Sequence, residues 1–510
     1  MTDVPGHTRS IIDPMYDAGI RLLHVGINSA CPLPSVPTFC RWRSPSGNDL
    51  LLVYQKDYGE DELLPDGKTV VSINFTGDNH GPHSYERVKK IYADLRKRYP
   101  QAQLVGASFN DVARELLLIK KDLPVVTSEI GDTWIFGYGG APIRMAKFRA
   151  VSWLYSQWLN EGKIKKDSDV ALDFAAELGL IAEHTQGVDV KTHLRQWDKY
   201  DMDKFLKGRS EGVFSMAEAS WKEIDNYIDS AIAFLPASLQ KEAREVVAEV
   251  DKVKLEDNSK MKPMARKRWE QPIAGGMTLA GLSYQMFDGD DYDDFQNRYL
   301  RARYEWALDD LGKRGLKESH AVSVTLYAQT MAQSVRKEKK GTRIITELRF
   351  PENEKVDKRV YPERIQVNCF TTKNGKRSEV ALTVYGKPAV RLPESYWLSF
   401  TVPGIESVIA EKMGERVDLM DVVEKGNRQM HGIDRYVDLI TSGETIRISS
   451  KEAFLLNVGE AQGLNYSTNY PDKRKGVHFN LNNNLWGTNF SMWNEGSLTY
   501  HFVIETLNHK

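Results

Sequence analysis

Arg21-Leu-Leu-His-Val-Gly-Ile27 is the first of several short apolar runs that decide the fold of the N-terminal region. Runs of this kind are typical of parallel strands that are buried on both faces. The others lie at 50–54, 70–75, 103–108 and 123–127. Between them, Val88, Ile91, Tyr92 and Leu95 share one stripe of the segment 84–99, which predicts an amphipathic crossover helix. The alternation predicts an α/β region of barrel type.

The apolar pattern changes after residue 140. Between residues 141 and 253 apolar residues recur at helical spacing in four segments, which predicts a helical bundle. The Lys-rich stretch 257–268 is typical of a linker, and beyond it period-two alternation predicts antiparallel strands, interrupted by one long helix at 292–312. The predicted fold class is therefore multidomain α/β + α + β. It comprises a partial (β/α) barrel over 1–140, a helical bundle over 141–256 and an antiparallel β-sandwich over 257–510.

Composition excludes several kinds of partner. The 510 residues carry 69 Lys and Arg against 70 Asp and Glu, so no net field favours nucleic acid or an anionic membrane. No run of about 20 apolar residues occurs, and no leader follows Met1, which predicts a protein outside the membrane. Three scattered cysteines favour a reducing compartment. The sequence as written predicts a cytoplasmic protein.

Three segments carry candidate catalytic or metal-binding groups. Asp3 precedes Pro5-Gly6 on a predicted strand-end loop, where barrel enzymes hold catalytic groups, although a turn-capping role fits equally. His184 ends an apolar helix with carboxylates beside it, where a structural His is the commoner case. Glu129 and Asp132 lie where a strand runs into a Gly-rich loop, and Asp132 could instead cap the helix that follows.

Further aromatic and polar residues are candidates for substrate binding. Trp42 and Trp134 could stack on sugar rings, although buried Trp side chains more often belong to the core. Asp78 and His80 share a strand-to-helix loop and are interpreted as pocket lining, because Gly81-Pro82 prevents the helical geometry that chelation at this His spacing uses. Amide-rich and aromatic stretches suit sugar hydroxyls but also suit turns between strands. These stretches contribute His431, Asn484 and Trp486.

Six segments together resemble the domain-of-unknown-function family 5054, which is related to the family 38 glycoside hydrolases. They are 2–28, 78–82, 129–141, 183–192, 281–299 and 486–493. The resemblance implies a zinc-dependent retaining hydrolase that acts on α-mannosides or related carbohydrates. It assigns Asp3 as nucleophile and zinc ligand, His184 as zinc ligand, and Glu129 or Asp132 as acid/base. His7 falls on the His of the family's first motif.

One departure from the family concerns the zinc site. Family 38 enzymes open with a strand whose His-x-Asp pair supplies two ligands, and no such pair occurs here. The resemblance therefore implies that the first part of the barrel is missing and that the zinc site is incomplete. An unpaired sheet edge would then favour a homo-oligomer, and a missing leader would change the compartment.

Two other functional classes stay open. One is a non-catalytic carbohydrate-binding relic, or an inactive truncated fragment. The other is a carbohydrate deacetylase, which uses a related barrel and His/Asp ligands, although the predicted helical bundle and large β-region argue against it. Whether the chain is an enzyme is therefore undecided at this stage, as are its sugar and its linkage.

Overall fold

A computed structural model describes residues 2–77 and 80–507. The N-terminal region forms a five-stranded mixed sheet in the order β1-β2-β4-β3-β7. Its strands are β1 (Thr2–Asp3), β2 (Leu22–Ile27), β3 (Phe39–Arg43), β4 (Asp49–Gln55) and β7 (Val125–Val126). β1, β2 and β4 run parallel, but β3 is antiparallel to β4. Within the described residues this sheet is open and does not close into a barrel.

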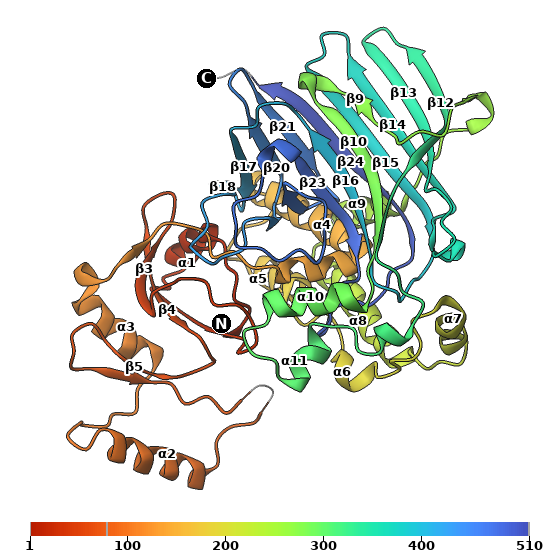
Figure 1. Cartoon of the computed structure of the whole chain (residues 1–510). Helices are drawn as coiled ribbons and strands as arrows, with labels where there is room; N and C mark the ends of the chain where they lie inside the picture. The colour runs from red at the N-terminus through yellow and green to blue at the C-terminus, as the bar shows by residue number, and fades with distance from the viewer. Residues whose placement is uncertain (1, 78–79, 508–510) are drawn as a thin grey trace.

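Two of the predicted N-terminal strands differ from the structure. Residues 103–108 form no strand, and β6 (Val70–Ser72) pairs only with β5 (Asp61–Leu63), apart from the main sheet. The predicted crossover helix exists as α2 (Tyr85–Arg98), but of its apolar stripe only Leu95 is buried. α2 therefore projects away from the body of the molecule instead of covering a sheet face (Figure 1). Two further helices, α1 (Ile12–Asp17) and α3 (Phe109–Leu118), flank the five-stranded sheet.

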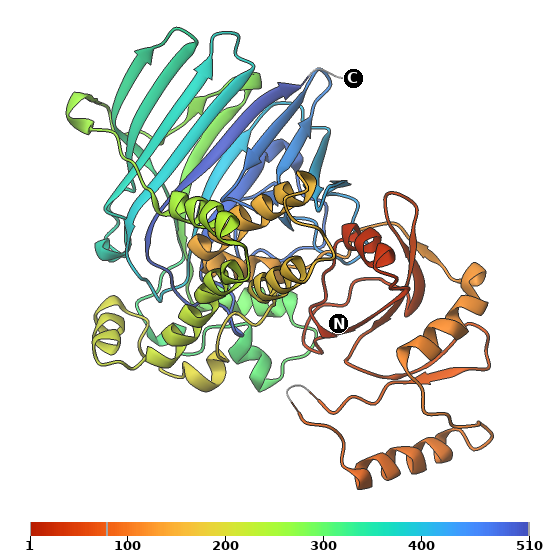
Figure 2. The ribbon, with the colours of Figure 1, turned by 180° about the vertical axis from the view of Figure 1, so that it is seen from behind.

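Helices follow the N-terminal region, as the 3.6-residue pattern predicted. Four long ones coincide with the predicted segments: α4 (Pro142–Asn160), α5 (Asp169–Gly179), α8 (Ser215–Ala233) and α9 (Ala237–Asp251). Two shorter helices, α6 (Val190–His193) and α7 (Met202–Ser210), had no clear signal. The helices lie over one side of the large sheets, beside the N-terminal region (Figure 2).

The rest of the chain is mostly antiparallel β-structure in two large sheets. The seven-stranded sheet has the order β11-β10-β16-β23-β22-β19, with β9 paired to β10. Its strands are β9 (Gln271–Pro272), β10 (Thr278–Met286), β11 (Val324–Tyr327), β16 (Glu394–Thr401), β19 (Met430–Gly432), β22 (Leu455–Val458) and β23 (Val477–Asn483).

The ten-stranded sheet has the order β18-β17-β20-β21-β24-β15-β14-β13-β12-β8. Its strands are β8 (Lys262–Pro263), β12 (Gln329–Lys337), β13 (Gly341–Arg349), β14 (Arg364–Thr372), β15 (Arg377–Lys387), β17 (Ser407–Lys412), β18 (Glu415–Asp418), β20 (Tyr436–Ile440), β21 (Thr445–Ser450) and β24 (Gly496–Leu507). β8 falls inside the stretch predicted as a linker.

The predicted long helix at 292–312 is wrong in its continuity. The chain forms α10 (Gly289–Tyr299) and α11 (Glu305–Asp310) with a break between them. At the break Arg301 donates its backbone N–H to the Ala30 carbonyl at 2.8 Å and its guanidinium to the Ser29 carbonyl. These contacts with the N-terminal region replace the helical hydrogen bonds.

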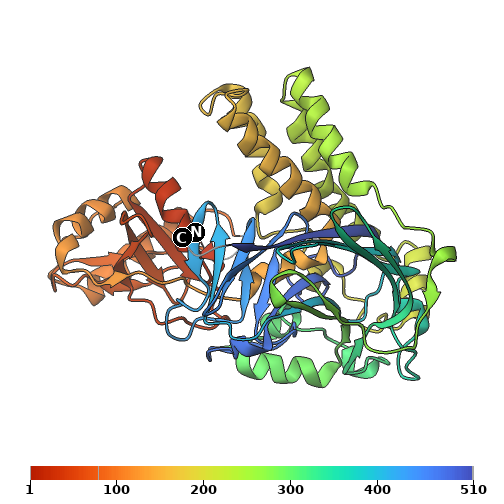
Figure 3. The same ribbon diagram turned by 90° about the horizontal axis from the view of Figure 1, so that it is seen from above.

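The two large sheets pack face to face through an aromatic core. Phe400 and Phe479 of the seven-stranded sheet contact Phe502 of the ten-stranded sheet, with ring centroids 5.4 and 5.1 Å away. Seen from above, the N-terminal region lies beside the strands β17, β18 and β20 at one end of these sheets (Figure 3). The chain is thus a mixed α/β protein with several antiparallel sheets. No helix within the described ranges is long and apolar enough to cross a membrane.

Candidate functional site

Asp3 is the last residue of β1, at the edge of the five-stranded sheet. Its carboxylate accepts hydrogen bonds from Asn28 Nδ2 at 2.9 Å and from the Tyr58 hydroxyl at 2.6 Å. Burial raises the pKa of Asp3, but the hydrogen bonds from His184, Tyr58 and Asn28 outweigh it and hold the pKa below its ordinary value. Asp3 also has a φ of 90°, a backbone conformation that is strained for a residue with a side chain. Such strain is concentrated at functional sites.

His184 approaches Asp3 from the segment that follows α5. His184 Nε2 lies 3.3 Å from Asp3 Oδ2, and Nδ1 lies 2.5 Å from Glu183 Oε1. The hydrogen bond with Asp3 raises the pKa of His184. An imidazole oriented by one carboxylate beside a second one is a common arrangement around protein-bound zinc. The structure therefore brings together the two residues predicted as metal ligands.

The donor set around this pair is short of a complete zinc site. Across residues 2–77 and 80–507, no three His, Cys, Asp or Glu side chains are grouped so as to hold a metal ion. A catalytic zinc ordinarily takes three protein ligands. Asp3 and His184 supply two donors, so a zinc ion held here would need at least one further ligand.

Asp132 lies on a loop that crosses the Asp3 segment. A β-carbon added to Gly6 would lie 2.8 Å from Asp132 Cβ, so this close crossing requires glycine. His7 and Ile130 join the two segments by backbone hydrogen bonds of 2.8 and 3.1 Å. The crossing explains the glycine of the motif, because no larger residue than Gly6 fits where the two loops meet.

Asp132 is almost completely buried and differs from Asp3 in its surroundings. The Tyr299 hydroxyl lies 3.1 and 3.2 Å from its two oxygens, and Trp134 donates its backbone N–H to Oδ2. Burial raises the pKa of Asp132 to about 6, against the hydrogen bonds from Trp134, Thr133 and Tyr299. Burial and the charges of Asp132 and Asp3 raise the pKa of the Cys31 thiol, and the Tyr299 hydroxyl lies 3.6 Å from the Cys31 sulfur.

Glu129, the alternative acid/base, is held by an ion pair. Its carboxylate accepts from Lys412 Nζ at 2.8 Å, from the Thr8 hydroxyl at 3.1 Å and from the Arg9 backbone N–H at 2.8 Å. These donors tie the N-terminal region to the end of β17. Glu129 is therefore engaged in joining two parts of the molecule.

The residues predicted to bind substrate lie in different places. Trp134 is close to His184, with ring centroids 6.2 Å apart, and Trp486 packs 6.4 Å from Trp134. Trp42 lies in the core, where its indole N–H donates to the Ser128 carbonyl. His80 is exposed before α2, and Asp78 lies outside the described residues.

His431 and Asn484 are buried in the large sheets. His431 Nε2 lies 2.8 Å from the Arg428 carbonyl, and burial lowers its pKa to about 3. The Asn484 side chain donates to the carbonyls of Val390, Leu392 and Met492. These contacts stabilise β23 and the turn after it, so the Asn-rich stretch is a buried strand with an internally bonded end.

Several site residues had no distinct signal in the sequence. Asn28, Tyr58 and Tyr299 contact the two carboxyl groups from segments that are 25 to 167 positions away. Asp310 lies in the same neighbourhood, with Lys191 Nζ 3.0 Å from its carboxylate. Burial raises the pKa of Asp310 to about 6, and the charge of Asp3 adds to this increase. Two of them, Asn28 and Tyr299, lie in the segments 2–28 and 281–299 that carry the resemblance described above.

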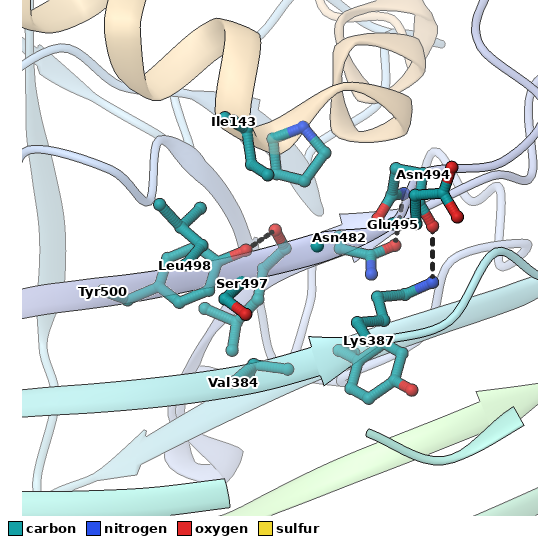
Figure 4. Close-up of a pocket in the computed structure, with 13 residues that line it drawn as sticks. Ile143, Val384, Lys387, Asn482, Asn494, Glu495, Ser497, Leu498 and Tyr500 are labelled. Carbon is teal, nitrogen blue, oxygen red and sulfur yellow. Dashed lines mark hydrogen bonds between the residues drawn. The ribbon is translucent and has the colours of Figure 1, made fainter. Parts of the chain in front are cut away.

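The cavity shown in Figure 4 is too small to be a substrate site. It lies where β15 and β24 meet the start of α4, and Figure 4 shows Lys387 reaching Asn494 there. Lys387 Nζ lies 3.0 Å from the Asn494 carbonyl and 2.6 Å from Glu394. The cavity measures about 20 Å³, which is room for a single water molecule. The buried ion pair there is structural.

The chain is a mixed α/β protein. Asp3 and Asp132 form a candidate site, one as nucleophile and one as acid, between its N-terminal region and its helices. Residues 139–273 match the model of a domain of unknown function, DUF5054. This match confirms the resemblance to that family, and it covers the helices α4–α9 and the segment after α5 that carries His184. No curated protein matches the chain.

Two similar solved structures are bacterial glycoside hydrolases. An α-mannosidase from Enterococcus faecalis V583 is 8% identical, with a TM-score of 0.49, and the alignment covers 99% of this chain and 73% of that chain. A glycosyl hydrolase family 38 protein from Enterococcus faecalis is 10% identical, with a TM-score of 0.44, over 99% and 72% of the two chains. At these identities and TM-scores the likeness does not establish a function, so a function has to be supported by the residues of the site.

Proposed function

We propose that this protein is a retaining glycoside hydrolase, with α-mannosides as the first substrates to test. The observation that carries the proposal is that two crossing loops carry two carboxyl groups whose surroundings differ. Asp3 is held by three hydrogen-bond donors, whereas Asp132 is buried against Tyr299. Paired carboxyls whose surroundings differ in this way divide into a nucleophile and an acid.

Asp3 is the nucleophile and Asp132 the acid/base in this proposal. Asp132 is preferred to Glu129, because Glu129 already accepts from Lys412, Thr8 and Arg9. In the first step Asp3 attacks the anomeric carbon while Asp132 gives its proton to the glycosidic oxygen, and the aglycone leaves as an alcohol. In the second step Asp132 takes a proton from water, the water oxygen attacks the anomeric carbon, and Asp3 is released.

The finer assignments belong to the same proposal. The five-stranded sheet would be part of a barrel of glycoside hydrolase type, and the two large sheets would form a sandwich of the mannosidase C-terminal type. The proposed substrate is a carbohydrate. Zinc would be held by Asp3 and His184 together with donors outside this pair, and no catalytic step depends on it here.

Hydrolysis of aryl glycosides by three proteins tests the catalytic roles. The wild type should release aryl alcohol from an α-mannoside with retained configuration, and Asp3→Asn should lose at least 1000-fold in kcat/KM. Asp132→Asn should lose most activity toward poor leaving groups but keep it toward 2,4-dinitrophenyl glycosides, with added azide restoring turnover. Equal losses for good and poor leaving groups in Asp132→Asn would contradict its role as acid.

Elemental analysis tests the zinc assignment separately. The wild type should contain near-stoichiometric zinc, and both Asp3→Ala and His184→Ala should lose it, while Asp173→Asn on the exposed face of α5 should not. Zinc-free protein with full activity would overturn this part of the proposal alone.

A non-catalytic carbohydrate-binding function is the second candidate. It is favoured by one observation, that the described residues supply only two zinc donors at Asp3 and His184. Sugar binding that persists in a chelator, without turnover of any glycoside, would support this alternative over hydrolysis.

A further inference from the structure

A cavity of about 770 Å³ opens beside Asp132 and His184. Its walls come from the crossing loops of the N-terminal region, the segment after α5 and the strands β17 and β19. Half of the residues that line it have aliphatic or aromatic side chains. The main apolar side chains are those of Ile135, Tyr138, Met430, Ile433, Phe454 and Phe490.

The charged groups in the cavity wall are engaged by the protein itself. Lys412 is paired with Glu129 at 2.8 Å. The Arg149 guanidinium donates to the carbonyls of Lys451 at 2.8 Å and of Ile433 at 3.3 Å, and Asp434 accepts from the Trp153 indole at 2.9 Å. A ligand rich in hydroxyl groups would have to displace these bonds, whereas an apolar ligand would leave them intact.

The position of Asp132 indicates which part of the substrate the cavity would bind. A general acid protonates the leaving-group oxygen, so the aglycone lies on the side of the acid. Asp132 forms part of the cavity wall, while Asp3 lies outside the lining. The cavity is therefore on the aglycone side of the scissile bond.

We propose that this cavity binds an apolar aglycone, an aryl group or a long alkyl chain, and that the protein acts on glycosides of such alcohols in preference to oligosaccharides. The inference rests on the proposed glycosidase function. The volume lies within the range of small-molecule pockets, roughly 300–1,000 Å³, and transfer of each methylene group from water into it favours binding.

Two glycosides with nearly equal leaving groups test the preference. Methyl and octyl α-mannoside differ in the apolar chain but little in the acidity of the alcohol, so a difference reports binding of the chain. We expect kcat/KM for the octyl glycoside to exceed that for the methyl glycoside at least tenfold, and a mannose disaccharide to resemble the methyl glycoside. Equal values for all three, or a preference for the disaccharide, would overturn the inference.

Cavity variants show whether the preference comes from this cavity. Ile135→Asn should lose the octyl advantage at least fivefold and leave the methyl glycoside nearly unchanged. Met413→Ser, at a side chain that is 54% exposed in the same wall, should have a smaller effect in the same direction and does not endanger folding. Leu172→Asn, equally exposed on α5 and away from the cavity, is the matched control.

Binding of 4-methylumbelliferone alone separates this inference from the proposed function. Its fluorescence should report a complex with the wild type and Leu172→Asn, weakened at least fivefold in Ile135→Asn. Binding without hydrolysis of any glycoside would mean that the proposed function fails while the apolar site stands. Hydrolysis without binding, or binding that is unaffected by Ile135→Asn, would reject the apolar site and leave the proposed function intact.

Discussion

Asp132 shows at the scale of one residue how a site is made at the expense of stability. Its carboxyl group is buried and accepts hydrogen bonds from the Trp134 backbone N–H and the Tyr299 hydroxyl, and it has no ion-pair partner among the residues that the structure describes. Burial raises its pKa from 3.8 to about 6. Between these two pH values the folded protein therefore binds more protons than the unfolded chain, so stability falls as pH rises through this window.

Asp132→Asn should accordingly stabilise the protein at neutral pH while it impairs catalysis. A shift of about two units corresponds to roughly 3 kcal/mol, the upper limit of the gain at pH 7.5, and the gain should shrink toward pH 4. Urea unfolding at both pH values measures it, with the exposed Asp173→Asn as the control. A variant less stable than the wild type at pH 7.5 would contradict this account. It would mean that the hydrogen bonds to the ionised Asp132 carboxylate outweigh the cost of burying its charge.

Sequence reasoning located Asp3 and His184 but not the groups around them. The Asp-Val-Pro-Gly-His motif is local, so its loop and its glycine can be inferred from a few consecutive residues. The choice between Glu129 and Asp132 depends on Lys412, which lies 283 positions from Glu129, and on Tyr299, which lies 167 positions from Asp132. Trp42 and Asn484 have residue types that suit sugar binding, and only tertiary packing places them in the core.

At the scale of elements, Arg149 connects the helices to the ten-stranded sheet. It projects from α4, stacks over Trp153 with its guanidinium 5.1 Å from the ring, and donates to the carbonyls of Lys451, Ile433 and Ser450. Burial lowers the pKa of its guanidinium to about 10. One buried cation thus satisfies carbonyls before β20 and at the end of β21, which lie together at the open end of the β20–β21 hairpin.

Arg149→Ala should cost about 3–5 kcal/mol of unfolding free energy, because it leaves several buried carbonyls without donors. Arg435→Ala is the matched control, since Arg435 also stacks over Trp153 but is 53% exposed, and it should cost less than about 1 kcal/mol. Denaturant midpoints of the two variants provide the comparison. Similar midpoints would mean that stacking on Trp153, and not the carbonyl bonds, holds the hairpin.

Element prediction succeeded where periodicity is local. The segment 214–234 predicted α8 (Ser215–Ala233) to within one residue at each end. It was wrong at 292–312, where Arg301 binds Ala30 and Ser29 of a distant segment and so interrupts the helix. The pattern at 84–99 correctly predicted α2 but not its exposure, because a stripe of apolar residues does not specify what covers it.

At the scale of the whole molecule, the site depends on how the N-terminal region docks against the large sheets. The buried pair Glu129–Lys412 crosses this boundary. The Glu129 backbone N–H also donates to the Asp421 carbonyl, and the Glu129 carbonyl accepts from the Val423 N–H, both at 2.9 Å. Two parts of the chain that are nearly 300 positions apart are thereby held in one arrangement around the cavity.

A double-mutant cycle on Glu129 and Lys412 should reveal strong coupling. Lys412→Met alone leaves a buried carboxylate without its cation and should cost about 3–5 kcal/mol, whereas the double variant Glu129→Gln/Lys412→Met should cost clearly less than the sum of the single changes. Urea unfolding of the four proteins measures the coupling energy. Additive losses would indicate that the docking does not depend on this pair.

The central claim is that Asp3 forms a covalent bond to the sugar, and trapping of that intermediate tests it most directly. The wild type would be incubated with a fluorinated mannosyl fluoride that forms the glycosyl-enzyme but hydrolyses slowly, and analysed by intact mass and peptide mapping. We predict one adduct per chain, on Asp3, that is absent from Asp3→Asn and that forms at a similar rate but decomposes more slowly in Asp132→Asn. No adduct on the wild type, or an adduct on another residue, would contradict the account.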